Sequence, residues 1–124
     1  MLITDTAIRL QLAGQTRYSH IVKNAPALIA VFLDTREMYN EVKDHQAAGA
    51  CIQNMLLAAE ELDLGAVWLG EILNRKDQVK QIIGVSDEHD LMAIIAIGHP
   101  THRDRNSKRK DIDNLIIKEI LEAS

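Results

Sequence analysis

The chain is poor in the residues that mark small secreted or disordered proteins. Its 124 residues include one cysteine, two prolines and 3% aromatic residues. A single cysteine excludes an internal disulfide, so no disulfide framework holds the chain together. The apolar and charged fractions, 47% and 26%, are those of ordinary globular proteins. We therefore expect residues 1–124 to form one domain around one hydrophobic core.

Long apolar runs are also missing. The longest uncharged apolar stretches, Ala25–Leu33 and Leu91–Gly98, are too short to cross a bilayer as helices. The amino terminus has no basic region followed by an apolar run. The net charge of −4 argues against a general nucleic-acid-binding protein, although five of the 14 Lys and Arg residues fall between Arg103 and Lys110. We expect a cytoplasmic protein that binds neither membranes nor nucleic acids.

Apolar periodicity and capping residues predict a mixture of helices and short strands. Asp5 is suited to cap the first helix, and Gly84 to end the third one. Leu91–Ile97 is almost entirely apolar, which predicts a strand that is buried on both faces. The expected elements are a strand at Leu2–Thr4, a helix from Asp5 to Ala13, a strand at Ala27–Leu33, a helix at Asp44–Leu64, a strand at Ala66–Gly70, a helix at Arg75–Ile83, a strand at Leu91–Ile97 and a helix from Asp111.

The helix predicted at Asp44–Leu64 has the clearest pattern, with Asp44 as its expected N-cap. Its apolar residues recur at spacings of three and four but extend unusually far around the cylinder. Small residues in its first half, Ala47–Ala50, leave room for another backbone. We therefore expect a second subunit to cover one side of this helix. Cys51, which lies among apolar neighbours in the same helix, is expected to be a packing residue and not a nucleophile.

The final segment is predicted to be an amphipathic helix. Asp111 would begin it, and its apolar side would comprise Ile112, Leu115, Ile116 and Ile120.

Three motifs resemble the FMN-dependent nitroreductase family, also known as NAD(P)H nitroreductases or flavin oxidoreductases. The run from Asp44 to Ala59, followed by Glu61–Gly70, is similar to the family's helix, glycine, strand and Trp-x-Gly sequence. Gly98-His99-Pro100 and the Lys/Arg loop after it stand where the family has a Gly-aromatic-Pro turn and a basic loop. Asn24–Ile29 resembles its Ala-Pro entry into a strand. The resemblance implies an α+β fold, with a small mixed sheet flanked by helices and a long central helix at a homodimer interface.

The resemblance does not reach the family's opening segments. Members usually begin with Arg-Arg-Ser-x-Arg and then Pro-Ser-x-x-Asn-x-Gln-Pro-Trp, which supply much of the flavin pocket. Both would precede Met1. The chain is therefore expected to be N-terminally short relative to the family, and to keep only part of what its relatives use to bind FMN.

The resemblance also implies site residues. The family places the backbone of its Trp-x-Gly turn beside the flavin ring, which corresponds here to Trp68, Leu69 and Gly70. A basic residue before the last helix holds the phosphate, a role that falls to Arg109 and next to Lys108. No residue is found for the N1/O2 edge of the ring, unless Arg17 or Lys23 of a partner subunit supplies a positive charge. No catalytic side chain is assigned.

Simpler interpretations stand beside these assignments. Trp68 could be a core residue, and the basic loop a solvated one. Glu71 could face the flavin or a substrate, or be a solvated turn carboxylate. His99, His102 and Asp104 have ligand chemistry suited to zinc or iron, but their spacing in a loop is loose, so no metal is expected.

The predicted function is that of an FMN-dependent oxidoreductase, passing hydride from NAD(P)H through flavin N5 to a nitro-aromatic, quinone or similar acceptor. The alternative is a non-catalytic homodimer that keeps the family's scaffold but no longer binds flavin.

Overall fold

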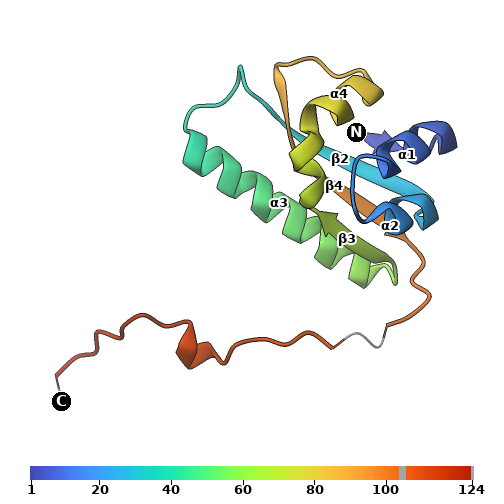
Figure 1. Ribbon diagram of the computed structural model, residues 1–124. Coiled ribbons are helices and arrows are strands. Elements are labelled where there is room, and N and C mark those ends of the chain that lie inside the picture. The colour runs from blue at the N-terminus through green and yellow to red at the C-terminus, as the bar shows by residue number, and fades with distance from the viewer. Residues whose placement is uncertain (104–105, 124) are drawn as a thin grey trace.

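The computed structural model describes residues 1–103 and 106–123. The folded body is a four-stranded sheet between helices, and the C-terminal segment extends away from it (Figure 1). The elements are β1 (Leu2–Ile3), α1 (Thr6–Ala13), α2 (Ser19–Asn24), β2 (Ala27–Asp34), α3 (Glu41–Glu61), β3 (Gly65–Leu69), a 3-10 helix (Glu71–Arg75), α4 (Lys76–Ile83), β4 (His89–Gly98) and a 3-10 turn (Ile112–Asn114). The predicted α+β class is confirmed.

The sheet has the strand order β1-β2-β4-β3, and each neighbouring pair is antiparallel, so the expectation of a mixed sheet is wrong in this detail. β4 is an interior strand, because Ile95 pairs with Ile29 of β2 on one side and with Trp68 of β3 on the other. Its residues Leu91 and Ala93–Ala96 are all buried. The sequence prediction of a strand covered on both faces is therefore confirmed for β4.

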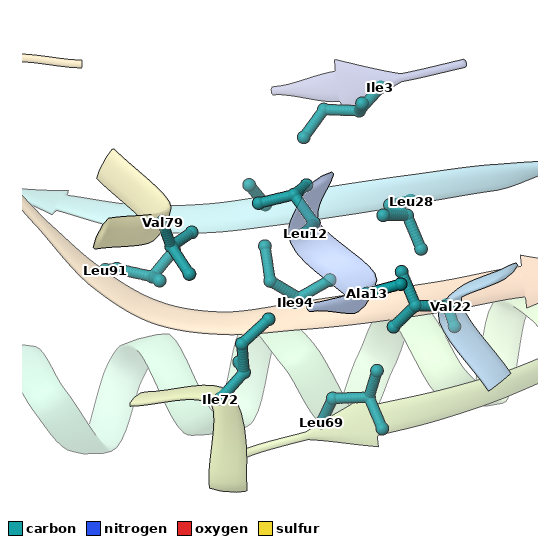
Figure 2. Packing of buried hydrophobic residues seen from close by; sticks show 12 residues of the cluster. Ile3, Leu12, Ala13, Val22, Leu28, Leu69, Ile72, Val79, Leu91 and Ile94 are labelled. Carbon is teal, nitrogen blue, oxygen red and sulfur yellow. The ribbon is translucent and has the colours of Figure 1, made fainter. Parts of the chain in front are cut away.

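Helices cover the sheet in two layers. Helices α1, α2 and α4 pack on one face, where Leu12, Val22 and Val79 meet Ile94 of β4 in the main core (Figure 2). α3 packs on the opposite face, where Ile52 meets Ala93 and Ile95. Fully burying a side chain of this size contributes about 1.5 to 3 kcal/mol, so the alternation along β4 stabilises both layers.

A bulge in the β2–β4 pairing decides which layer Leu91 joins. Val31 pairs with Ala93, but the next residue, Phe32, pairs with Leu91. Strict alternation would place Leu91 on the same face as Ala93. The skipped residue, Met92, instead allows Leu91 to pack in the main core with Ile94.

The helix starts agree with the sequence in one case and differ in another. The Asp5 carboxylate accepts a hydrogen bond from the Ile8 N–H at 2.9 Å, which confirms it as the N-cap of α1. The predicted N-cap Asp44 of the long helix is wrong, because α3 begins at Glu41 and the Asn40 side chain caps it. Asp44 lies in the first turn and accepts the backbone N–H of Asn40 at 2.9 Å. Both residues are good caps, and the extended backbone of Asn40 decides between them.

The predicted helix from Asp111 is also wrong. Only Ile112–Asn114 forms a single 3-10 turn, and the rest of residues 106–123 has no regular structure. The apolar residues expected on one side of that helix are exposed, including Ile112 at 68% and Ile120 at 87%. A helix of this length is marginal in water unless its apolar stripe packs on something, and the exposure of these side chains shows that no described part of the chain covers them.

The outward side of α3 is exposed in the single chain. Ala48, Ile52 and Ala59 face the sheet. A second series at spacings of three and four points away from it and comprises Ala47, Ala50, Cys51, Asn54, Leu57 and Ala58, which we call the α3 stripe. The expectation that Cys51 is a packing residue is therefore wrong for the chain by itself, since Cys51 is exposed.

Membrane-spanning helices were also sought. Among the helices of residues 1–103 and 106–123, none has both the length and the apolarity needed to cross a bilayer.

Candidate functional site

The end of β3 and the turn that it enters carry three of the five predicted site residues: Trp68 and Leu69 end the strand, and Gly70 follows it. β3 lies at the edge of the sheet and pairs only with β4, so its other backbone edge faces no strand of the described chain. Leu69 is buried in the main core and fixes the end of the strand. Trp68 points to the α3 side and is 42% exposed, so it is not the core residue that the simpler interpretation made it. Its ring lies over Gly49 of α3, where an added Cβ would be 3.8 Å from Trp68 Cη2.

Gly70, at the end of this turn, is a glycine that the chain's own packing does not require. Its φ of −89° and ψ of −27° suit any residue. A Cβ added there would meet nothing within 4 Å, whereas one added to Gly98 would lie 2.6 Å from Pro26 Cδ. The space above Gly70 is therefore open to an approaching molecule, which is the property that a flat ring resting on backbone needs.

Glu71, the next residue, ties this turn to the connection between α1 and α2. Its carboxylate accepts the Thr16 hydroxyl at 2.5 Å and the Arg17 N–H at 3.2 Å. The Thr16 hydrogen bond is the main reason that the pKa of Glu71 lies below its ordinary value, and the Arg17 contact adds to it. The interpretation of Glu71 as a solvated turn carboxylate is wrong, because the carboxylate is a half-buried anchor. No local signal could have revealed a partner 55 residues away.

Arg17 is brought beside the turn of its own chain by these contacts. Its guanidinium lies 5.0 Å from the centre of the Tyr18 ring and donates to the Tyr18 hydroxyl at 3.1 Å. The sequence analysis considered Arg17 only as a residue of a partner subunit that could supply a positive charge to the flavin ring. In the structure the backbone N–H of Arg17 contacts Glu71 of the same chain, and the positive charge of Arg17 helps to lower the pKa of Glu71, whereas Lys23 lies on α2.

The basic loop does not join the turn. Arg103 packs against the end of α3, donating to the Asp63 carbonyl at 2.7 Å. Lys108 and Arg109 are exposed in the segment that runs away from the folded body (Figure 1). The predicted ring and phosphate residues are therefore separate in one chain, and Arg105 lies outside the described residues.

The metal hypothesis gains no geometric support. His99 and His102 are exposed, and Asp104 lies outside the described residues. Within residues 1–103 and 106–123, no three His, Cys, Asp or Glu side chains are grouped to hold a metal ion.

Two surface hollows lie away from the turn. The one between β2 and α3, of about 450 Å³, is lined by Thr35, Met38, Tyr39, Asn40, Glu41, His45 and Asp90. The other, of about 490 Å³, is lined by Met1, Phe32, Gly84, Val85, Ser86 and His89.

Comparison with known proteins assigns the chain and its fold to a family. Residues 3–99 match the sequence model of the nitroreductase family. The chain belongs to the nitroreductase family. A provisionally named nitroreductase of Desulfovibrio desulfuricans, solved in complex with FMN, superposes with a TM-score of 0.91 at 46% identity, over 98% of this chain and 72% of that one.

Sequence relatives carry flavin-related names. The NADPH-flavin oxidoreductase of Vibrio harveyi is 28% identical over 110 residues, which cover 79% of this chain and 46% of that protein. The NADPH-dependent FMN reductase of Bacillus subtilis is 29% identical over 86 residues, which cover 69% of this chain and 34% of that protein. The chain thus spans about half the length, or less, of the curated relatives that it matches.

Proposed function

We propose that the protein is an FMN-dependent oxidoreductase that passes hydride from NAD(P)H to a nitro-aromatic, quinone or similar acceptor. The family supports a flavin oxidoreductase, and a structural relative at 46% identity was solved with FMN. The observation that carries the proposal for this chain is Gly70, whose open space is explained neither by its backbone angles nor by internal packing. When bound, the flavin supplies the hydride-accepting N5.

The residues of the turn would hold the ring. The unpaired edge of β3 offers backbone donors and acceptors to the polar edge of a flat heterocycle, and Gly70 lets the ring come close. Leu69 anchors the turn from the core side, so the backbone there is held in place before the ring arrives. Glu71 holds Arg17 beside the same turn, where its positive charge would favour a reduced, anionic ring.

The phosphate would be held by Arg109 and Lys108. Because these residues lie in the extended segment, they reach a ring site only if that segment packs on a folded body. A second copy offers such a body, so the proposed flavin site is shared between two chains.

We therefore propose a homodimer formed through α3. Two apolar surfaces are uncovered in the single chain: the α3 stripe, and the C-terminal residues Ile112, Leu115, Ile116, Ile117, Ile120 and Leu121. Exposed apolar surfaces of this kind mark interaction sites, and each is suited to cover the other in a symmetric pair. The cytoplasmic location remains a prediction from the sequence.

Absorption spectra and FMN titration test the proposal. The chain has one tryptophan, Trp68, two residues from Gly70, so bound flavin should quench its fluorescence. We expect saturable quenching, a flavin absorption band in the complex and bleaching of that band by NADH or NADPH under anaerobic conditions. A stable dimer with no quenching and no flavin band would contradict the oxidoreductase and support the non-catalytic homodimer. That alternative is favoured by the separation of Lys108 and Arg109 from the turn in one chain.

A further inference from the structure

The contact between Arg103 and the end of α3 has no role in the flavin site. It joins residues that are 40 and 43 positions apart in the sequence. The guanidinium donates to the Asp63 carbonyl at 2.7 Å and to the Glu60 carboxylate at 3.4 Å. It also lies 3.7 Å from the Asp63 carboxylate. Arg103 therefore makes three contacts with a single helix end.

The C-terminal end of α3, which Arg103 binds, has a well-defined backbone conformation. Asp63 has a left-handed backbone, with a φ of 58°, and is the only non-glycine residue of the described chain with a positive φ. Its N–H donates to the Glu60 carbonyl at 3.0 Å, and the Leu64 N–H donates to the Ala59 carbonyl at 2.8 Å. This is the Schellman arrangement, which satisfies the last carbonyls of a helix. The Asp63 carbonyl is left facing outward, and a cation there is favoured by the negative end of the helix dipole.

Arg103 is also the point where the chain leaves the body. Among the described residues, it makes the last side-chain hydrogen bonds between the C-terminal part and the folded body. The residues after it include the exposed apolar group between Ile112 and Leu121. Ile112 is nine positions beyond Arg103, so it can lie up to about 30 Å away, which is about the length of α3.

We propose that Arg103 anchors the root of the C-terminal segment at the end of α3, and so directs residues 112–121 onto a second copy of this chain. Arg103 is a positioning residue and not a phosphate ligand. The inference rests on the proposed homodimer and adds the residue that aims the segment. A fixed root reduces the volume that the segment explores, and this raises its effective concentration at the partner's surface. The charge pairs with Glu60 and Asp63 make the anchor sensitive to salt.

Sedimentation tests the proposal by measuring the dimer dissociation constants of three variants of residues 1–124 and of the wild type. Arg103→Ala should raise the constant about fivefold or more, because the freed segment loses effective concentration. Arg36→Ala is the matched control, since it removes an exposed arginine that pairs with Asp34 at 2.8 Å and Glu88 at 3.1 Å, away from this region. It should leave the constant unchanged. Arg103→Lys, which keeps the charge without the fork, should recover part of the loss.

A fourth variant separates anchoring from simple stabilisation of α3. Ile117→Ser combined with Ile120→Ser makes the segment polar, and both positions are exposed, so the fold should be unaffected. If Arg103 acts through the segment, Arg103→Ala should add no further loss in this background. An equal additional loss would overturn the proposal, as would a wild-type constant for Arg103→Ala in an intact dimer. A wild-type protein that stays monomeric would overturn both this inference and the homodimer.

Discussion

Gly98 lies so close to Pro26 that a Cβ atom at position 98 would be 2.6 Å from the proline Cδ and 3.0 Å from its Cγ. The two residues end the paired region of β2 and β4, and Pro26 cannot move without shifting the start of β2. Packing within the chain therefore requires glycine at position 98. It does not require glycine at position 70, where an added Cβ would have nothing within 4 Å.

Gly98→Ala should lower the free energy of unfolding by about 1 to 3 kcal/mol, because the methyl group overpacks a rigid neighbour. Urea denaturation followed by circular dichroism gives this value. A variant as stable as wild type would contradict this prediction and show that Pro26 can shift to make room for the methyl group.

Gly70→Ala should fold almost normally but bind FMN at least about tenfold more weakly, a loss of about 1.4 kcal/mol. Its unfolding free energy should stay within about 1 kcal/mol of wild type, since the backbone suits alanine and the space is open. Trp68 fluorescence measures both quantities. Unchanged FMN affinity would remove Gly70 from the ring site.

Arg109→Ala should weaken FMN binding by about 1.5 to 3 kcal/mol, or roughly one to two powers of ten, if its guanidinium holds the phosphate. Arg109→Lys should restore part of this, because it keeps the charge and loses the bidentate fork. Riboflavin, which lacks the phosphate, is the control ligand and should bind wild type and Arg109→Ala equally. Equal FMN affinities would exclude Arg109.

Ala58→Glu should weaken dimerisation by about tenfold or more, because a symmetric interface buries the added charge twice. Gln81→Glu adds the same charge to an exposed position of α4, which lies on the other face of the sheet from α3, and serves as control. Ala48, which faces the sheet, is unsuitable because its substitution would disturb the core. Sedimentation at several concentrations separates the two variants, and equal dimer constants would place the interface elsewhere.

Thr16→Val should raise the pKa of Glu71 toward its ordinary value of 4.5, since the Thr16 hydroxyl is the main cause of the lowering. The folded-state pKa lies below the unfolded one, so the stabilisation is present above the unfolded value and is lost as the pH falls through the folded value. Wild type should therefore lose more stability than Thr16→Val on acidification from about pH 6 to about pH 3. NMR titration of the Glu71 carboxyl carbon measures the shift, with Thr101→Val, an exposed threonine, as control. No change in the Glu71 pKa would show that another group holds the carboxylate.

Residue order alone was sufficient for the features that depend on near neighbours. Asp5 caps α1 because its carboxylate reaches an N–H three residues on, and the unbroken apolar run of β4 requires burial on both faces. The short strand that closes on Gly70 was predicted in the same way, whereas a role for Trp68–Gly70 beside a flavin came only from the family resemblance. These features depend on capping chemistry and side-chain period, which are written into a few adjacent residues.

Tertiary structure decided the features that depend on distant partners. Asn40 and Asp44 are equivalent caps by type, and only the path of the chain out of β2 selected Asn40. Folding brings Thr16 to Glu71, so the Glu71 carboxylate is held by a hydrogen bond that the sequence does not predict. Arg103 was predicted to belong to the basic loop, but in the fold it binds the end of α3. The C-terminal apolar pattern predicts a helix that does not form in one chain. Periodicity states which face must be buried, but a surface to bury it on exists only when another part of the fold, or another chain, provides it.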